Sequence, residues 1–281
     1  MANRLRNSIT LWVQGGLGNQ LFQLNAGLTA SAASEAPLLI SRASYWRDSL
    51  RGFQLKPLVD ERRLATLFED LLVGPPHARS GELRKMTKRM NLRISESVAE
   101  ADSGSVLMVG YFQDQGSIRL GTGKLLERLR AVGLDPKYAS LGQMVEQRPV
   151  VHIRRGDYVT LASARKTFGT LSSEYYHEAL DRLGHQASDA VFFSDDPEFV
   201  RREFGVSPEL VIGPSAVKSD LQTLMLMSLG QDIVIPNSTF SWWAAELMGK
   251  RGQVVAPKIW FYDRDESQWP QRQHWLRHDN K

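Results

Sequence analysis

The stretch Pro149–Tyr158 reads PVVHIRRGDY and sets the pattern for the second half of the chain. A short, mainly apolar run ends in a polar Arg-Arg-Gly-Asp turn, as expected where a buried strand leaves a sheet. Similar apolar runs recur at Ala190–Phe193, Glu209–Ile212, Asp232–Ile235 and Gln253–Ala256. Short strands that alternate with helices of about ten residues are typical of βαβ units and a parallel sheet.

The segments between these strands, and the first half of the chain, complete the predicted fold. The expected helices of the second half are Ser172–Leu183, Pro197–Phe204, Asp220–Leu229 and Ser238–Met248. In the first half we expect strands at Ser8–Val13, Leu38–Ile40 and Val106–Val109, a turn at Gly15–Gly18, and helices at Asn19–Ala33 and Asp60–Leu72. The sequence therefore predicts an α/β protein of two facing lobes, residues 1–140 and 141–281, divided within 134–148. Ligands of such sheets bind at the carboxyl ends of the strands.

The composition excludes several classes of protein. A chain of 281 residues is long enough for about two domains. Because there is no cysteine, disulfide scaffolds, thiolate metal sites and cysteine nucleophiles are excluded. The 35 basic and 31 acidic side chains give a net charge of +4, which suits a phosphate-bearing ligand and does not require nucleic acid. The apolar run Ile9–Val13 is too short for a signal peptide, so we expect a cytoplasmic protein without a nucleic-acid partner.

The first motif, GGLGNQ at Gly15–Gln20, lies between a predicted strand and a predicted helix. Glycines let the backbone approach a ligand, and the following helix offers free N–H groups. A dinucleotide fingerprint would need glycine where Leu21 stands, and a P-loop would need Lys-Ser/Thr after the second glycine. A ligand contact through Gly16, Asn19 and Gln20 and a plain tight turn both remain open.

The second motif is the end of the opening stretch, His152–Tyr158. Two guanidinium groups at the carboxyl end of a strand suit a bidentate grip on phosphate, so we predict this role for Arg154 and Arg155. Asp157 can orient one guanidinium or act as a base. The alternative is an ordinary solvated surface.

Two further blocks follow predicted strands. In FFSDD, Phe192–Asp196, either acid can cap the helix that starts at Pro197 or accept hydrogen bonds from a nucleoside, and Asp195 and Asp196 can divide the two roles. In IPNSTFSWWAAEL, Ile235–Leu247, a cluster of small polar residues opens a helix whose N–H groups suit phosphate. Its candidate donor-binding residues are Asn237, Ser238, Thr239 and Ser241. Trp242 and Trp243, on the same helix, are expected in the core.

Several other features carry less weight. The Asp263-Arg-Asp265 triplet could hold a divalent ion through phosphates, although an exposed loop is the favoured interpretation. The histidines form no zinc-binding pattern, so we expect no metal. A basic run within residues 79–93 is typical of a solvated helix face or of peripheral contact with an anionic membrane. Its members are Arg79, Arg84, Lys85, Lys88, Arg89 and Arg93.

With these four blocks in this order, the sequence resembles the bacterial α-1,2-fucosyltransferase family, glycosyltransferase family 11. The blocks span residues 15–247, nearly the whole chain. The resemblance implies a GT-B-type fold of two facing Rossmann-like domains, with GDP-L-fucose bound mainly by the C-terminal domain. It also implies a metal-independent, inverting transfer of fucose to the 2-hydroxyl of a β-galactoside, the activity of a galactoside 2-α-L-fucosyltransferase. The acceptor can be a free oligosaccharide or a lipid-linked glycan.

The resemblance also implies roles for single residues. Arg154 and Arg155 would hold the donor diphosphate, and His152 and Asp157 would complete that site. Asn237, Ser238 and Thr239 would contact phosphate or ribose, and Asp195 or Asp196 would lie towards the guanosine. Gly16, Asn19 and Gln20 would reach the fucose and the acceptor.

The chemistry requires positive charge at the leaving group. When the fucosyl–phosphate bond breaks without a metal, cationic groups and a helix N-terminus must stabilise the released phosphate. A carboxylate beside two arginines is a weak base, so Asp157 is only the nearest candidate and the base is unassigned. Three alternatives remain: another nucleotide-sugar donor in the same fold, a metal-dependent transferase that uses Asp263, and a non-catalytic protein whose tryptophan-rich end stacks on sugars.

Overall fold

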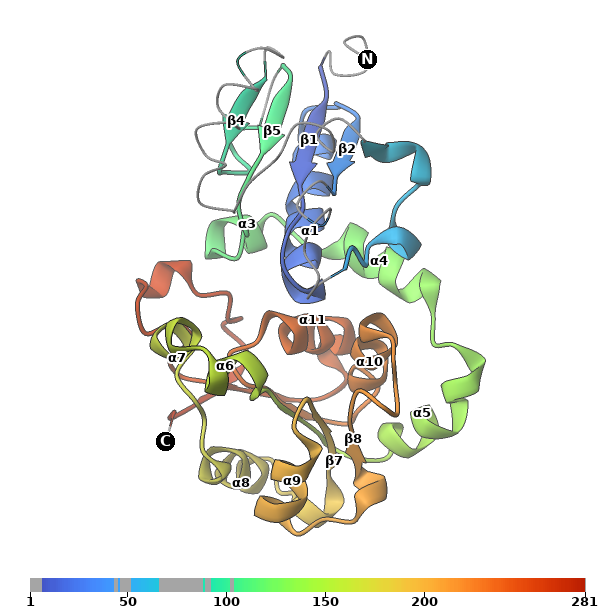
Figure 1. The fold of residues 1–281 in the computed structure, drawn as a ribbon, viewed down its shortest axis with the longest axis vertical. Coiled ribbons are helices and arrows are strands. Elements are labelled where there is room, and N and C mark those ends of the chain that lie inside the picture. Colours follow the sequence, from blue (N-terminus) through green and yellow to red (C-terminus); the bar gives the residue numbers. More distant parts are fainter. Residues whose placement is uncertain are drawn as a thin grey trace. The chain divides into compact units, whose positions relative to one another are not determined.

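A computed structural model describes residues 7–42, 45, 52–65, 88, 92–101 and 104–280 of the chain. The chain divides into two compact units, Met1–Val132 and Gly133–Lys281 (Figure 1). Each unit is built around its own parallel β-sheet with helices between the strands. The predicted α/β class, with a parallel sheet in each of two units, is confirmed.

The first unit holds a five-stranded sheet in the order β3-β2-β1-β5-β4. Its strands are β1 (Ile9–Trp12), β2 (Leu38–Ser41), β3 (Leu64–Ala65), β4 (Arg93–Ser95) and β5 (Val106–Met108). Its helices are α1 (Leu17–Ala33), α3 (Gln115–Arg119) and α4 (Gly123–Val132), with 3-10 turns η3 (Lys56–Leu58) and η4 (Glu61–Arg63). The central strand β1 pairs in parallel with β2 and β5, so that Ile9 is opposite both Leu38 and Val106.

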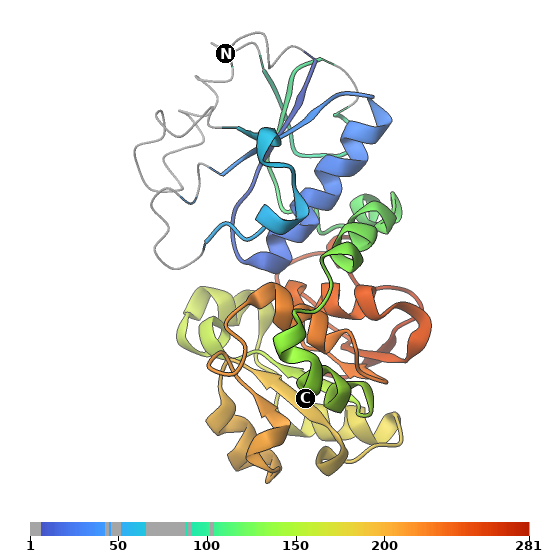
Figure 2. The same cartoon turned by 90° about the vertical axis from the view of Figure 1, so that its right-hand side faces the viewer.

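The turn between β1 and α1 depends on its glycines. Gly15 has φ +80°, and a Cβ there would lie 2.7 Å from Nδ2 of Asn19, so a side chain would be strained and would clash. Gly16 is the N-cap of α1 and provides no side-chain cap. α1 then packs against β1 and β2 (Figure 2).

The second unit holds a six-stranded sheet in the order β11-β10-β9-β6-β7-β8. Its strands are β6 (Val150–Ile153), β7 (Val191–Ser194), β8 (Val211–Ile212), β9 (Ile233–Val234), β10 (Val254–Pro257) and β11 (Leu276–His278). Its α-helices are α5 (Ala139–Glu146), α6 (Gly156–Thr160), α7 (Ala162–Phe168), α8 (Ser173–Arg182), α9 (Pro197–Phe204), α10 (Asp220–Met227) and α11 (Thr239–Met248). Its 3-10 turns are η5 (Pro136–Tyr138), η6 (Ala187–Asp189), η7 (Pro208–Leu210), η8 (Gly249–Arg251) and η9 (Glu266–Gln268). Counted from β6, the strand order is 3-2-1-4-5-6, which is the order of a dinucleotide-binding Rossmann domain.

The two faces of this second sheet are covered by different helices. Val151 and Ile153 of β6 join a buried cluster with Tyr175 of α8 and Phe199 of α9. The alternate residue His152 points to the other face, where its ring lies 5.7 Å from that of Phe240 in α11. The sheet is therefore buried on both sides, as the apolar strands predict.

One expectation about the fold needs correction. The predicted helix Asp60–Leu72 is wrong at its start, because Glu61–Arg63 is a single 3-10 turn and Leu64–Ala65 is a strand paired with β2; residues 66–72 lie outside the described part. The stretch 134–148, in which the sequence places the domain boundary, contains η5 and α5. The side chain of Gln222 in α10 bonds the main chain of Gly133 and Asp135, which fixes this stretch to the second unit.

Candidate active site

The switch point of the second sheet lies between β6 and β9, where the strand order reverses. Ligands of open α/β sheets bind outside the carboxyl ends of the strands at such a point. The loop after β6 carries the two arginines, and the loop after β9 leads into the N-terminus of α11. The loop after β7, the strand next to β6, carries Asp195 and Asp196. Three of the four sequence blocks therefore meet at one edge of one sheet.

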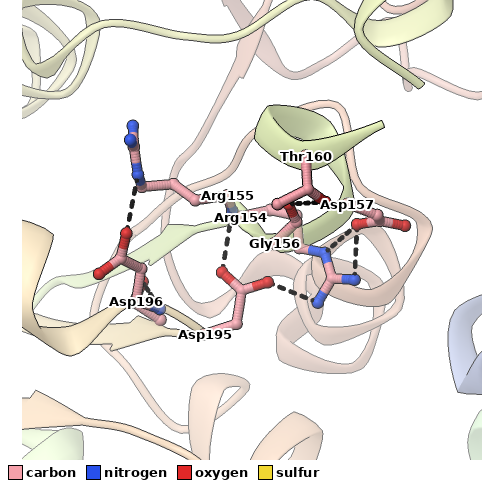
Figure 3. Close-up of polar contacts among 8 residues, drawn as sticks. Arg154, Arg155, Gly156, Asp157, Thr160, Asp195 and Asp196 are labelled. Carbon is pink, nitrogen blue, oxygen red and sulfur yellow. Dashed lines mark hydrogen bonds and ion pairs between the residues drawn. The ribbon is translucent and has the colours of Figure 1, made fainter. Parts of the chain in front are cut away.

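Arg154 is enclosed by carboxylates (Figure 3). Its Nε and Nη2 donate to Oδ1 of Asp157, at 3.1 and 2.7 Å, and its Nη1 lies 2.8 Å from Oδ2 of Asp195. Burial lowers the pKa of Arg154, but the charges of Asp195 and Asp157 outweigh that effect and raise it. All three guanidinium nitrogens are therefore engaged, and the group stays charged.

Arg155 is bound differently, and Figure 3 shows its guanidinium pointing away from the Arg154 cluster. Only its Nε is engaged, at 3.1 Å from Oδ2 of Asp196, while the guanidinium carbon lies 3.7 Å from the centre of the Phe199 ring. Among the described residues, neither Nη group has a hydrogen-bond partner. The side chain is 25% exposed. Its outer edge can therefore grip a phosphate in the bidentate manner of a guanidinium.

The two acids after β7 hold the arginine loop in place. Asp195 Oδ1 accepts the backbone N–H of Arg155 at 2.8 Å, in addition to the ion pair with Arg154. Asp196 caps α9 by accepting the N–H of Phe199 at 3.1 Å and also bonds Arg155. Of the two roles predicted for these acids, helix capping is observed and belongs to Asp196. The nucleoside contact stays a prediction.

The glycine of the Arg-Arg-Gly-Asp turn allows this close approach. A Cβ on Gly156 would lie 2.7 Å from Oδ2 of Asp195, the oxygen that pairs with Arg154. A side chain at position 156 would therefore push Asp195 away from Arg154. The turn is specified by packing against the acid, which the sequence alone does not reveal.

His152 lies beneath this loop and is 6% exposed. Burial, and next the charge of Arg154, lower its pKa to about 3, so the imidazole is neutral at pH 7. Its Nδ1 is buried without a hydrogen-bond partner among the described residues. A buried unpaired nitrogen is costly, and such exceptions are concentrated at functional sites.

The Asn-Ser-Thr block is more buried than its predicted role suggests. Asn237 is 2% exposed, and its Nδ2 donates to the carbonyls of Phe168 and Trp260, at 2.5 and 3.0 Å. Tyr158 donates its hydroxyl to the Asn237 carbonyl at 3.0 Å, which ties the β6 and β9 loops together. Asn237 therefore braces three segments at this edge of the sheet.

The rest of the block forms the start of α11. Ser238 is the N-cap, without a side-chain capping bond, and Ser241 is fully buried and donates to the Ser238 carbonyl at 3.2 Å. Thr239 is half-buried. The first turn of α11 therefore presents main-chain N–H groups that no Ser238 side chain caps.

The candidates of the first unit lie apart from this cluster in the sequence and belong to the other sheet. Gln20 is fully buried; its Nε2 donates to the carbonyls of Gly15 and Gly52, at 3.0 and 2.9 Å, and its Oε1 accepts the N–H of Gln54. Asn19 accepts a bond from Gln113 at 3.0 Å. Gly16 has open space where a Cβ would be. Gln20 is thus a brace between loops, and Gly16 leaves the approach to α1 open.

Some residues of the site were missed in the sequence. The ring of Phe199 supports Arg155, and Tyr158 joins two loops, but neither residue belongs to a recognisable pattern. In the first unit, the segment Gly110–Asp114 also follows a predicted strand, as the recognised blocks do, and the sequence reading did not single it out. The rule that polar residues after a parallel strand face a ligand would have found it.

The weaker sequence features have varied outcomes. The structure buries the tryptophans of the C-terminal half that were expected in the core, Trp242 and Trp243, together with Trp260 and Trp275.

Asp263 is exposed, and no group of three or more potential metal ligands occurs among the described residues. Nor does the described part contain a helix long and apolar enough to cross a membrane. The basic run lies outside the described residues except for Lys88 and Arg93, both exposed.

Comparison with known proteins shows the family to which the chain belongs. A 28% identity extends over 90% of this chain and 91% of alpha-1,2-colitosyltransferase from Escherichia coli. The O-antigen biosynthesis glycosyltransferase WbnK from Escherichia coli is 36% identical over 42% of this chain and 40% of its own length. Among solved structures, the fucosyltransferase NodZ from Bradyrhizobium matches with a TM-score of 0.48 and 14% identity, covering 86% of this chain and 92% of that chain. The profile of Glycosyl transferase family 11 matches residues 110–278, more than half of the sequence, and the chain belongs to that family.

Proposed function

We propose that the protein transfers L-fucose from GDP-β-L-fucose to the 2-hydroxyl of a terminal β-galactoside, forming an α-1,2 linkage with inversion. The observation that carries the proposal is the free outer edge of Arg155 at the switch point of a Rossmann sheet. Membership of family 11 supports a nucleotide-sugar donor. The 28% identity to an alpha-1,2-colitosyltransferase supports the position of the linkage.

The residues of the second unit divide the work of donor activation. The bond from the anomeric carbon to the β-phosphate oxygen breaks with its electron pair on phosphate, and the acceptor oxygen forms the new bond. Arg155 and the first turn of α11 stabilise the charge that builds on the leaving phosphate. Arg154 acts indirectly, because Asp157 and Asp195 engage all its guanidinium nitrogens. It holds Asp195, and Asp195 in turn accepts the backbone N–H of Arg155.

The proton of the acceptor hydroxyl has no assigned receiver. Asp157 Oδ1 is engaged by Nε and Nη2 of Arg154, so this oxygen is not offered to an acceptor hydroxyl. His152 is neutral but 6% exposed, so it is poorly placed to take a proton from a bulky acceptor. A largely dissociative transition state with late proton loss to water is consistent with this arrangement. No metal or other cofactor is required in this scheme.

The test is turnover with defined donors and acceptors. The purified protein is incubated with a β-galactoside and GDP-fucose, GDP-mannose or UDP-galactose, and the product linkage is read by NMR. We expect an α-1,2-fucosylated product from GDP-fucose and much slower reaction with the other donors. Transfer from UDP-galactose in preference to GDP-fucose would refute the donor assignment.

GDP-colitose is a second candidate donor, because the relative that matches 90% of this chain is an alpha-1,2-colitosyltransferase. Colitose is fucose without its 3-hydroxyl. If the site hydrogen-bonds that hydroxyl, GDP-colitose should be rejected by about 10⁴-fold in kcat/KM, whereas an apolar site would discriminate by about 100-fold or less. Measuring kcat/KM for both donors decides between them.

The remaining alternatives differ in what they require. A sugar-binding surface of C-terminal tryptophans is disfavoured because four of the five, Trp242, Trp243, Trp260 and Trp275, are buried.

A lipid-linked acceptor would bring the enzyme to the cytoplasmic face of a membrane, and the basic run 79–93 would then add electrostatic attraction to anionic lipids. Flotation with phosphatidylglycerol vesicles at low and high salt tests this contact, since binding that persists at high salt would contradict it.

A further inference from the structure

The first sheet has its own switch point, between β1 and β5, where the strand order reverses. The loop after β1 is the glycine turn, and the loop after β5 reads GYFQD, Gly110–Asp114. The carboxyl ends of these adjacent parallel strands lie side by side, so the two loops share one edge of the sheet. Such an edge is where ligands of parallel sheets bind.

The GYFQD loop is fixed to α1 by side-chain amides. Gln113 Nε2 donates to Oδ1 of Asn19 at 3.0 Å, and Gln23 Nε2 donates to the carbonyl of Gly110 at 3.1 Å. At its far end Asp114 caps α3 by accepting the N–H of Ser117 at 2.9 Å. The loop is therefore held from both ends in one shape.

That shape includes an unfavourable backbone conformation. Phe112 has φ +52°, which is uncommon for a bulky residue and costs about 1–3 kcal/mol. Its side chain is 5% exposed, whereas the neighbouring ring of Tyr111 is 42% exposed. The loop thus buries one ring and presents the other to solvent, and backbone strain of this kind is concentrated at ligand sites.

Polar groups accompany the exposed ring. Gln113 is 9% exposed, and its Oε1 has no partner among the described residues, while its Nε2 is held by Asn19. In the glycine turn, nothing lies within 4 Å of the position that a Cβ of Gly16 would take. The loop contains no basic residue, and Asp114 adds negative charge, so the loop suits a neutral ligand better than a phosphate.

We propose that Tyr111 and Gln113 form the binding subsite for the acceptor glycoside. The Tyr111 ring stacks on the apolar C–H face of a pyranose, and Gln113 Oε1 accepts a hydrogen bond from a sugar hydroxyl. A neutral pyranoside has both features, an apolar face and hydroxyl donors at its rim. The identity of the glycoside as a fucose acceptor rests on the proposed function; the glycoside subsite itself does not.

The experiment compares Tyr111→Ala with Tyr111→Phe and with Leu120→Ala. Leu120 is a matched control because it is another large exposed side chain of the first unit, at 54% exposure. Two kinetic readouts are taken: hydrolysis of GDP-fucose without acceptor, and transfer over a range of methyl β-galactoside concentrations. Saturation-transfer NMR of methyl β-galactoside on each variant gives a third readout that needs no turnover.

We expect Tyr111→Ala to raise the acceptor KM by about tenfold, the upper range for an aromatic contact, with donor hydrolysis unchanged. Tyr111→Phe keeps the ring and should stay within about twofold of the wild type, as should Leu120→Ala. An acceptor KM unchanged by Tyr111→Ala, or raised equally by Leu120→Ala, would overturn the proposal. If the wild type turns over no GDP-fucose, the proposed function fails, and the NMR signal still decides on the subsite: loss only in Tyr111→Ala supports it, and no signal in the wild type refutes it.

Discussion

Replacing Arg155 with alanine tests the division of labour between the two arginines. No described residue bonds the outer edge of Arg155 at the switch point, while Arg154 is enclosed by Asp157 and Asp195. Removing one preorganised donor to a developing negative charge costs about 3–4 kcal/mol, or about 10²- to 10³-fold in kcat. We expect that loss in Arg155→Ala.

The fold should tolerate this change. The pair of Arg155 with Asp196 is partly exposed, at 25% and 40%, so screening limits its contribution to below about 1 kcal/mol. The contact with the Phe199 ring adds about 0.5–1 kcal/mol. The free energy of unfolding should therefore fall by less than about 2 kcal/mol, much less than the loss in transition-state stabilisation.

Arg154→Ala is the informative comparison. It leaves Asp157 and Asp195, whose side chains are 24% and 20% exposed, without their common partner. Breaking a partly buried pair of this kind costs about 2–3 kcal/mol, and each kcal/mol lowers Tm by about 2–4 °C in a chain of this size. Arg154→Ala should therefore lose activity together with more stability than Arg155→Ala, whose main loss should be in activity.

The assay combines three measurements on each variant. GDP release gives kcat and KM, calorimetry gives the affinity for GDP, and thermal unfolding gives Tm. Arg155→Lys keeps the charge without the planar fork and should recover about tenfold of the lost rate. A folded Arg155→Ala variant with kcat/KM close to that of the wild type would refute the assignment of the phosphate contact.

The remaining predictions concern His152, Gly156 and the metal question. His152 has a folded pKa of about 3 against 6.5 unfolded, so the wild type should lose stability as pH falls below 6.5, by up to about 1.4 kcal/mol per pH unit. Urea unfolding between pH 7 and 4 should show a shallower loss for His152→Leu; an equal slope would contradict the buried neutral imidazole. Gly156→Ala should displace Asp195 and lower kcat about tenfold or more, while Gly104→Ala, at a glycine with open space but φ +76°, should affect only Tm. EDTA and Asp263→Asn should both leave GDP release unchanged, and a loss in either would favour a metal-dependent mechanism.

The sequence predicts the second unit well because its strands are strongly apolar. Pro197–Phe204 begins and ends as expected, since proline after an acid marks the first turn and Gly205 ends the helix in a left-handed conformation. The loops that carry Arg154 and Ser238 are found for the same reason, as each follows a buried run. The edge strand β11 escapes detection because Leu276–His278 is polar and only partly buried.

What the sequence does not reveal is which polar groups are already occupied. Asn237 and Gln20 have the residue types of ligand contacts, but their amides bond main-chain atoms far away in the sequence. Asp60–Leu72 has helical spacing, but pairing of Leu64 with β2 overrides that local preference. Long-range hydrogen bonds and strand pairing leave no periodic signal, so these errors have a common physical origin.

The balance of charge at the arginine loop bears directly on how the leaving group is stabilised. Two guanidinium groups are paired with three carboxylates, so the cluster as a whole is not cationic. Attraction of a diphosphate must then come from geometry: Arg155 presents its unpaired edge outward, while the carboxylates lie on the other side or are held by Arg154. A fixed dipole of this kind loses little energy to reorganisation during the reaction, which is the condition under which electrostatic stabilisation is most effective. In the proposed mechanism the acids would act by holding one positive edge in place, so we expect that removing them impairs the reaction even though it makes the site more positive.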